Sequence, residues 1–309
     1  MRFFNRTDSV VSLAALALLA AVPLLTSDNY VLGILITAIC YAIWAGSWDL
    51  LSGLTGRENF GHSLFIGAGA YAAAYLNTAY GIDLGWGIVV APLVSGTLGA
   101  LIGLPTLRLQ GPYFALATLV ASAIAHTLCL LLWRVTGGEE GLSGILPMAG
   151  SQSDYYYLVL TIGFVSIAAM KLFALSDAGL VLRAIGSDEA ICRAAAIDVD
   201  AYKITTFAFS AAFAGLGGAL FAGYQLTAAP DLLSSGLSIT IVVMAYVGGM
   251  GTIYGPAVAA LFLALIVEYL RGFGEYRLLV YGLILLVVVR LTRHGFVDPF
   301  WRWLKGRLA

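Results

Sequence analysis

The chain contains very little charge for its length. Only 11% of its 309 residues are Asp, Glu, Lys or Arg, whereas 61% are hydrophobic. A soluble domain carries about 25% charged residues, so this deficit leaves too few for a surface in water and predicts lipid as the solvent. The net charge of −1 lacks the basic excess typical of nucleic-acid-binding proteins, so no nucleic acid is expected as a partner.

The sequence also lacks the residue patterns of an enzyme or a metalloprotein. Cys40, Cys129 and Cys192 are isolated, and His126 and His294 have no ligand-like neighbours. We find no nucleophile–base pair, no paired carboxylates within an apolar segment and no phosphate-binding glycine-rich loop followed by lysine. We therefore expect no catalytic residue, no metal and no cofactor. The function must depend on what passes through the chain and what docks on it.

Long apolar segments take up most of the chain. A membrane span needs about 20 apolar residues, and we identify ten candidate segments. They are Val10–Thr26, Tyr30–Leu51, His62–Ala79, Trp86–Leu104, Tyr113–Trp133, Tyr155–Ala174, Ile204–Leu226, Leu237–Tyr254, Pro256–Phe273 and Leu278–Leu291. The sequence predicts an all-α, polytopic membrane protein with about ten transmembrane helices, forming a single domain over residues 1–309.

The first segment has a second interpretation. Arg2 and Arg6 precede its apolar run, as in a secretory signal peptide. We favour an uncleaved first span, because no clean cleavage site follows and the next segment is another span rather than a secreted domain.

The distribution of basic residues predicts the orientation. With a cytoplasmic N-terminus and ten spans, thirteen of the 16 Lys and Arg residues fall on the inner side, and the outer loops are acidic. This is the asymmetry of the positive-inside rule. An odd number of spans would place either the charged 176–203 loop or the basic C-terminal tail outside, so both termini are expected in the cytoplasm. Trp301 and Trp303, with basic neighbours, predict a short interfacial helix at the inner leaflet.

The longest polar interval, residues 176–203, lies between two apolar spans on the inner side. Its first part interleaves apolar residues such as Leu182 and Ile185 with charged ones such as Arg183 and Glu189. This pattern predicts a short amphipathic helix. A charged helix in a loop of a membrane protein favours a docking role.

Two glycine-rich interruptions break the apolar runs, at Leu51–Tyr71 and at Tyr246–Pro256. Irregular backbone at membrane depth is tolerated only where it is buried in protein or lines a water-filled cavity, and broken helices present backbone groups to the solute in many transporters. A tight inner turn with small-residue packing explains them equally well, so both interpretations stay open. The two segments are loosely alike, which is a weak hint of an internal repeat.

Polar residues within the interruptions are the candidates for a solute pathway. Charges near a membrane core are costly and tend to be paired or functional, although a solvated inner turn would also accommodate them. The candidates are Arg57, Glu58, Asn59, Gly61 and His62 in the first interruption, and Gly249, Gly251 and Thr252 in the second. Glu268 and Arg271, three residues apart, are expected to form a structural ion pair or to line a gate.

An ordered series of short motifs resembles one known family. The series comprises Gly61-His62, Gly67–Tyr71, Leu107–Leu109, Gly111, Tyr113–Ala115, Thr118-Leu119, Thr136–Gly138, Gly141-Leu142, Arg183–Ile185, Asp188–Ala190, Phe207, Ser210-Ala211, Ala214-Gly215, Gly217-Gly218, Gly248-Gly249, Gly251-Thr252 and Gly255-Pro256. In this order, from about Tyr41 to Val289, the chain resembles the LivM-type permease subunits of ATP-binding-cassette importers for branched-chain amino acids.

The resemblance implies a set of partners and a coupling mechanism. It implies a homologous second permease subunit, two cytoplasmic ATPase subunits that bind ATP, and an extracytoplasmic substrate-binding protein, all at a bacterial plasma (inner) membrane. Hydrolysis then belongs to the partners, and this chain is not itself an enzyme. The coupling segment, about 176–203, would dock on an ATPase. Its implied coupling residues are Arg183, Asp188, Glu189, Ala190, Arg193 and Ala194.

Departures from the family pattern leave the solute open. Arg57-Glu58-Asn59 stands where Gln-x-Ser is common, Ala195-Ala196 where Met-Gly is usual, and Glu139-Glu140 where a small polar–acidic pair is usual. We therefore expect branched-chain amino acids or a related small polar solute, and Arg57 would suit a carboxylate.

The alternative function is an ion-coupled secondary transporter or channel for small solutes. Such a protein would favour ionisable residues within its spans. Only Asp49 and Glu268, close to span ends, and Glu58 in the first interruption are candidates, which favours the importer.

Overall fold

The computed structural model describes residues 6–26, 28–109 and 111–269, and this part of the chain is almost entirely helical. Its elements in order are α1 Arg6–Leu25, α2 Asn29–Thr55, α3 His62–Tyr80, η1 Leu84–Trp86, α4 Gly87–Thr106, α5 Pro112–Leu131, α6 Trp133–Thr136, η2 Gly138–Glu140, β1 Leu142–Ser143, α7 Gln152–Leu175, α8 Asp177–Ser187, α9 Glu189–Ala194, α10 Val199–Gln225, β2 Thr227–Ala228, η3 Pro230–Leu233, α11 Ser235–Gly248 and α12 Tyr254–Tyr269. The strands β1 and β2 form one short antiparallel pair.

The expected all-α membrane architecture is confirmed. Over the described residues, five helical segments are long and apolar enough to cross a membrane, those of α2, η1–α4, α5, α7 and α10, and the apolar parts of α1, α11 and α12 are shorter. Nine of the ten segments expected from the sequence coincide with a helix. The tenth, Leu278–Leu291, and the interfacial helix around Trp301 and Trp303 lie outside the described residues.

One expected span ends earlier than its hydropathy indicates. The segment Leu237–Tyr254 is helical only as far as Gly248, after which Gly249, Gly251 and Ile253 have φ of 94°, 78° and 64°. Backbone in this left-handed region cannot continue a right-handed helix. The chain therefore turns sharply before α12 begins at Tyr254.

Helix α10 lies at the centre of the bundle and packs against α2, α3 and α4. Its glycines allow this close packing. A Cβ atom on Gly69 of α3 would stand 2.4 Å from the Cα of Gly215 of α10, which is closer than any side chain allows. The glycine-rich composition therefore serves helix–helix contact, as is typical of membrane bundles.

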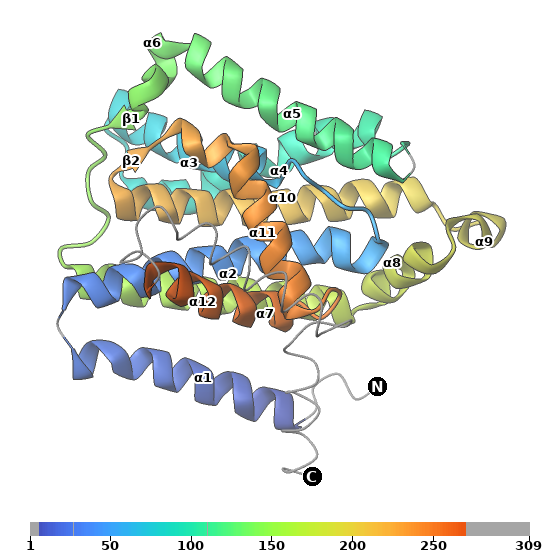
Figure 1. Cartoon of the computed structure of the whole chain (residues 1–309), viewed down its shortest axis with the longest axis horizontal. Helices are drawn as coiled ribbons and strands as arrows, with labels where there is room; N and C mark the ends of the chain where they lie inside the picture. The colour runs from blue at the N-terminus through green and yellow to red at the C-terminus, as the bar shows by residue number, and fades with distance from the viewer. Residues whose placement is uncertain (1–5, 27, 110, 270–309) are drawn as a thin grey trace.

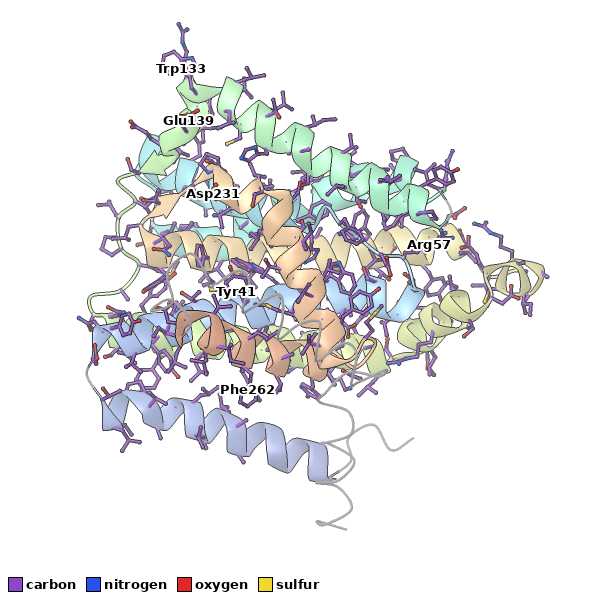
Figure 2. All side chains as sticks on the ribbon, viewed as in Figure 1. Tyr41, Arg57, Trp133, Glu139, Asp231 and Phe262 are labelled. Carbon is purple, nitrogen blue, oxygen red and sulfur yellow. The ribbon has the colours of Figure 1, made fainter. Side chains whose placement is uncertain are left out.

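The helices form layers between α5 on one side and α1 on the other, with α10 and α2 between them (Figure 1). The loops gather at two opposite ends. One end carries β1 and β2, and the other carries α8 and α9. Figure 2 places Arg57 toward the α8–α9 end and Glu139 toward the opposite end.

The first glycine-rich interruption returns into the bundle. After α2 ends at a left-handed Gly56, the Trp48 indole N–H donates to the Asn59 carbonyl (2.6 Å) and His62 contacts Ser47 (2.9 Å). Ser47 lies eight residues before the end of α2, which is about 12 Å along the helix. Helix α3 therefore begins deep within the bundle rather than at its end.

A second helix begins in the interior in the same way. Helix α10 ends at a left-handed Leu226, and the chain passes through β2 and η3 before α11 starts. The Ser63 N–H near the start of α3 donates to the Ser238 hydroxyl near the start of α11 (2.9 Å). Thus α2–α3 and α10–α11 share one plan, a long helix followed by a returning segment and a helix with an interior N-terminus. Interrupted helices in matching halves are typical of transporters.

Candidate functional site

The polar interval 176–203 folds into two short helices, α8 and α9, and the first turn of α10. Helix α8 is amphipathic and buries Leu182 and Ile185. Asp188 ends α8 and caps α9, because its carboxylate accepts hydrogen bonds from the N–H groups of Ala190 (2.9 Å) and Ile191 (3.0 Å). The helix expected here is therefore present, with a bend at Asp188.

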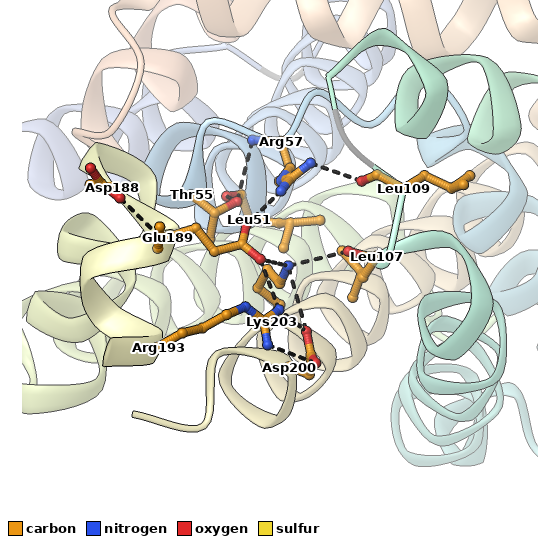
Figure 3. A network of polar contacts seen from close by, with 11 residues as sticks. Leu51, Thr55, Arg57, Leu107, Leu109, Asp188, Glu189, Arg193, Asp200 and Lys203 are labelled. Carbon is orange, nitrogen blue, oxygen red and sulfur yellow. Dashed lines mark hydrogen bonds and ion pairs between the residues drawn. The ribbon is translucent and has the colours of Figure 1, made fainter. Parts of the chain in front are cut away.

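Glu189 is the centre of a charge network that joins α9 to two other parts of the chain, the α2–α3 segment and α10 (Figure 3). Its carboxylate pairs with Arg57 of the α2–α3 segment at 2.5 Å, with Arg193 of α9 at 2.9 Å and with Lys203 of α10 at 2.9 Å. Arg193 also pairs with Asp200 at 2.8 Å. Glu189 therefore faces into the protein and holds the segment onto it.

Two backbone carbonyls of the turn between α4 and α5 complete this network. Arg57 donates to the Leu109 carbonyl (2.8 Å), and Lys203 donates to the Leu107 carbonyl (3.2 Å). The Lys203 side chain is only 1% exposed. A buried ammonium needs such partners, since desolvation without compensation costs several kcal/mol.

The network keeps Glu189 ionised. Partial burial alone would raise the pKa of its carboxyl, but hydrogen bonds from Lys203, Arg57 and Arg193 outweigh burial and lower the pKa to about 2. The carboxylate is thus charged at any physiological pH.

Beside the network, a cavity of about 790 Å³ opens between residues 176–203, the α2–α3 segment and the start of α5. Arg57, Glu58, Asp188, Glu189 and Arg193 supply its charged lining. Because α8 and α9 form one wall, a movement of α9 would change the shape of this cavity.

Of the remaining candidates of the first interruption, Asn59, Gly61 and His62 are packed in the interior, and Glu58 is partly exposed. Asn59 and His62 are buried and within hydrogen-bonding distance of each other (3.4 Å). Gly61 donates its N–H to the Asn59 side chain, and Glu58 accepts a hydrogen bond from Tyr246 of α11. The structure thus brings Arg57 to Glu189, and it places Asn59 and His62 against α2.

The second group of candidates forms the turn between α11 and α12, which three helices clamp. The buried Asp49 of α2 accepts hydrogen bonds from the N–H groups of Gly251 (2.6 Å) and Ile253 (2.8 Å). Lys171 of α7 donates to the Thr252 carbonyl (2.9 Å). Arg183 of α8 donates to the Gly251 carbonyl at 3.3 Å, which joins α8 directly to this turn. Gly249 lies at the end of α11 and starts the turn.

Sequence reasoning missed Lys203, Asp200 and Asp49 as members of these sites. Asp49 is a lone carboxylate within an apolar span. Burying such a charge is costly unless it has hydrogen-bond partners, and this is the signal that could have identified Asp49 as a residue with dedicated partners. Of the expected pair of Glu268 and Arg271, only Glu268 lies in the described part, where it accepts a hydrogen bond from Tyr30 (2.7 Å). The described residues contain no group of His, Cys, Asp and Glu that could hold a metal ion.

Comparison with known proteins points to transport permeases. The family model described as branched-chain amino acid transport system / permease component matches residues 30–289. The chain is 29% identical to the high-affinity branched-chain amino acid transport system permease protein LivM of Salmonella typhimurium, over 92% of this chain and 74% of that protein. The chain is also 29% identical to the Escherichia coli protein of the same name, over 92% of this chain and 73% of that protein.

A probable branched-chain amino acid transport permease protein LivM of Methanocaldococcus jannaschii is 25% identical, over 45% of this chain and 42% of that protein. No solved structure matches the chain significantly.

Proposed function

The chain belongs to the family of branched-chain amino acid transport permease components and is a permease subunit of an ATP-binding-cassette importer, and we propose that residues 176–203 are the segment through which an ATPase drives it. The observation that carries this proposal is the Glu189 network. One carboxylate of α9 binds the returning α2–α3 segment through Arg57 and the start of α10 through Lys203. A force on α9 thereby reaches two spans at once.

The coupling segment has two faces with different roles. Leu182, Ile185 and Cys192 are buried against the bundle, whereas Ile191 is 66% exposed. An exposed large apolar side chain on a charged helix at the end of a membrane protein suits a protein partner. We assign the Ile191 face, with Ala190 and Ala194, to the ATPase, and the Glu189 face to the permease itself.

A second connection runs from α8 to the turn between α11 and α12. Arg183 donates to the Gly251 carbonyl while Asp49 and Lys171 hold the same turn from α2 and α7. Because α11 begins in the interior beside α3, movement of this turn would be transmitted to the centre of the bundle. Packed elements with two discrete arrangements are the physical basis of such coupling.

The importer requires further subunits and a defined orientation. We propose a second, homologous permease, two cytoplasmic ATPases and an extracytoplasmic binding protein, with both termini of this chain in the cytoplasm of a bacterial inner membrane. The end that carries α8 and α9 is then the cytoplasmic end. The solute is a branched-chain amino acid or a related small polar molecule, and a pair of two different permeases forms its pathway.

The carboxylates that a secondary transporter would use have other partners. Asp49 holds the α11–α12 turn, Glu58 accepts a hydrogen bond from Tyr246, and Glu268 accepts one from Tyr30. These contacts favour the ATP-driven importer.

The test is Ile191→Asp in the complete complex, co-expressed with the neighbouring genes and reconstituted in lipid. We expect the variant chain to fold but to lose co-purifying ATPase and solute uptake, because a charge replaces the apolar contact. Leu146→Asp is the matched control, since Leu146 is 62% exposed at the opposite end. Unchanged ATP-coupled uptake in the Ile191 variant would remove the docking assignment. Charge reversal at Glu189 or Arg183 is expected to uncouple hydrolysis from uptake.

A further inference from the structure

Two adjoining cavities open between α2, α10 and α11, away from the coupling segment. Their volumes are about 600 Å³ and 460 Å³, and both are lined by Tyr41, Phe221, Gln225 and Thr240. The two cavities adjoin at these four shared residues, and the pair is called the vestibule below. It adjoins β2, at the end of the bundle that we assign to the outside.

Three aromatic side chains line the first cavity; Tyr41 and Phe221 are partly exposed, and Trp44 is buried and packs against both. Tyr41 and Trp44 meet edge to face with their ring centroids 4.9 Å apart, and Trp44 and Phe221 follow at 5.5 Å. Tyr41 and Trp44 lie one turn apart on α2, and Phe221 comes from α10. The faces and edges of such a cluster give a solute both apolar contact and π-electron density.

Asp231 supplies a negative charge to the same wall. Asp231 is exposed, and its carboxylate forms no hydrogen bond or ion pair with the described residues. The second cavity carries Glu268 at its edge. No Lys or Arg is among the described residues that line either cavity. Asp231 therefore gives the described lining of the vestibule a negative charge beside its aromatic side chains.

The position of Asp231 differs from that of Arg57, the residue that the sequence suggested as a partner for a charged solute. Arg57 was expected to suit a solute carboxylate, but its guanidinium pairs with Glu189 and the Leu109 carbonyl at the other end of the bundle. Figure 2 shows Arg57 far along the molecule from Asp231 and Tyr41. Arg57 is thus not part of the described lining of the vestibule, whereas Asp231 is.

We propose that this vestibule binds the ammonium group of the solute, with Asp231 as its counter-ion and with Tyr41 and Phe221, packed on the buried Trp44, as its aromatic wall. A carboxylate attracts an ammonium group by charge, and aromatic faces add cation–π attraction. Gln225 and Thr240 offer additional hydrogen-bond partners at the join of the two cavities. Solutes that carry only a carboxylate are disfavoured here.

The proposal rests on the proposed function in one respect, that the bound molecule is the transported solute. The charge preference of the vestibule belongs to this chain alone. It is therefore measured on the purified full-length chain, without ATPase or binding protein.

The first measurement uses a cysteine reporter, Gln225→Cys, and two thiol reagents of similar size. Aminoethyl methanethiosulfonate is a cation and sulfonatoethyl methanethiosulfonate is an anion. The native Cys40, Cys129 and Cys192 are buried, and the chain without the reporter gives their background rate. We expect Asp231→Asn to lower the ratio of the cationic reagent's rate to the anionic reagent's rate roughly 10-fold. A nearby unit charge in a partly desolvated site has an effect of this size.

Two controls separate the vestibule from the general surface charge. Glu139→Gln removes an exposed acid outside the cavity lining and should leave the ratio unchanged. A reporter at Gly150, where a Cβ meets nothing within 4 Å, should not respond to Asp231→Asn.

The second measurement compares protection of the reporter by three molecules that share an isobutyl group. Leucine and 3-methylbutylamine carry an ammonium group, whereas 4-methyl-2-oxopentanoate carries only the carboxylate. Protection by the first two and not by the third is expected, and Asp231→Asn should weaken it. A rate ratio insensitive to Asp231, or equal protection by the oxo acid, would overturn the proposal. Either result leaves the coupling assignment intact, because that assignment concerns the opposite end of the chain.

Discussion

The Glu189 network allows a quantitative prediction for the variant Glu189→Gln. The neutral side chain keeps the size of glutamate but loses the charge that binds three cations. Lys203, which is 1% exposed, would keep only the Leu107 carbonyl and Asp200 at 3.7 Å. A hydrogen bond to a charged group contributes about 1.5–3 kcal/mol, and an exposed pair such as that of Arg193 contributes about 0–1 kcal/mol.

The pKa of Glu189 gives a second measure of the same effect. The carboxyl pKa falls from its ordinary value of 4.5 to about 2, despite the opposing effect of burial. A fall of this size corresponds to roughly 3 kcal/mol in favour of the docked, ionised form. We therefore expect Glu189→Gln to destabilise the docking of residues 176–203 by about 3 kcal/mol, which increases the open population roughly 100-fold.

Hydrogen exchange of the backbone in residues 176–203 measures this opening directly in the purified chain. Exchange there should accelerate in Glu189→Gln, and it should not change in the spans or in the control Glu139→Gln. In the complete importer, the number of ATP molecules hydrolysed per solute transported should rise. The loosened 176–203 segment no longer transmits the movement of the ATPase to the helices of the permease.

A double-mutant cycle with Lys203→Met tests the electrostatic reasoning. The double variant leaves no buried cation at position 203, so its segment should open less than that of Glu189→Gln alone. Two results would refute the role of Glu189 in holding residues 176–203 to the bundle. One is hydrogen exchange in Glu189→Gln that equals that of the unsubstituted chain, and the other is strictly additive effects of the two substitutions.

Three further predictions concern Asp49, Gly69 and the pH dependence of the Glu189 network. Asp49→Asn replaces one of two buried acceptor oxygens at the α11–α12 turn by an N–H donor, and should lower thermal stability in detergent by about 2–3 kcal/mol. Gly69→Ala forces a methyl group into the α3–α10 contact, and should lower the midpoint of thermal unfolding, whereas Gly150→Ala should leave it unchanged. The folded pKa of Glu189 is depressed, so its stabilising effect is complete above pH 4.5 and is lost as the pH falls toward about 2. Proteolytic cleavage of residues 176–203 at graded pH, with an acid-tolerant protease, should accelerate in that window only.

Local patterns in the sequence determine much of the architecture. Hydropathy over about 20 residues identifies a span wherever it lies in a fold, and nine of the ten expected segments are helices in the described chain. The cap at Asp188 and the amphipathic α8 depend on neighbours within four residues, so the helical nature of 176–203 was predictable. The glycines that allow close helix packing were evident from composition, although not which helices they join.

Pairings between distant residues were not predictable in this way. Arg57 and Glu189 are 132 positions apart, and Asp49 and Ile253 are 204 apart. No period or cap relates such positions. The same limit explains why Arg57 was considered for a solute carboxylate when its charge is already satisfied by Glu189.

The sequence by itself determined that lipid surrounds this protein, where most of its helices lie, and that a charged segment interrupts them, because each depends on composition or short-range spacing. The tertiary structure alone decided that the first glycine-rich interruption returns into the bundle while the second is a clamped turn. It also decided which charges neutralise each other, and that Asp231 lines the same cavity as three aromatic rings. These features arise when helices far apart in the chain pack together, and only their packing sets which polar groups lose water and must find a partner.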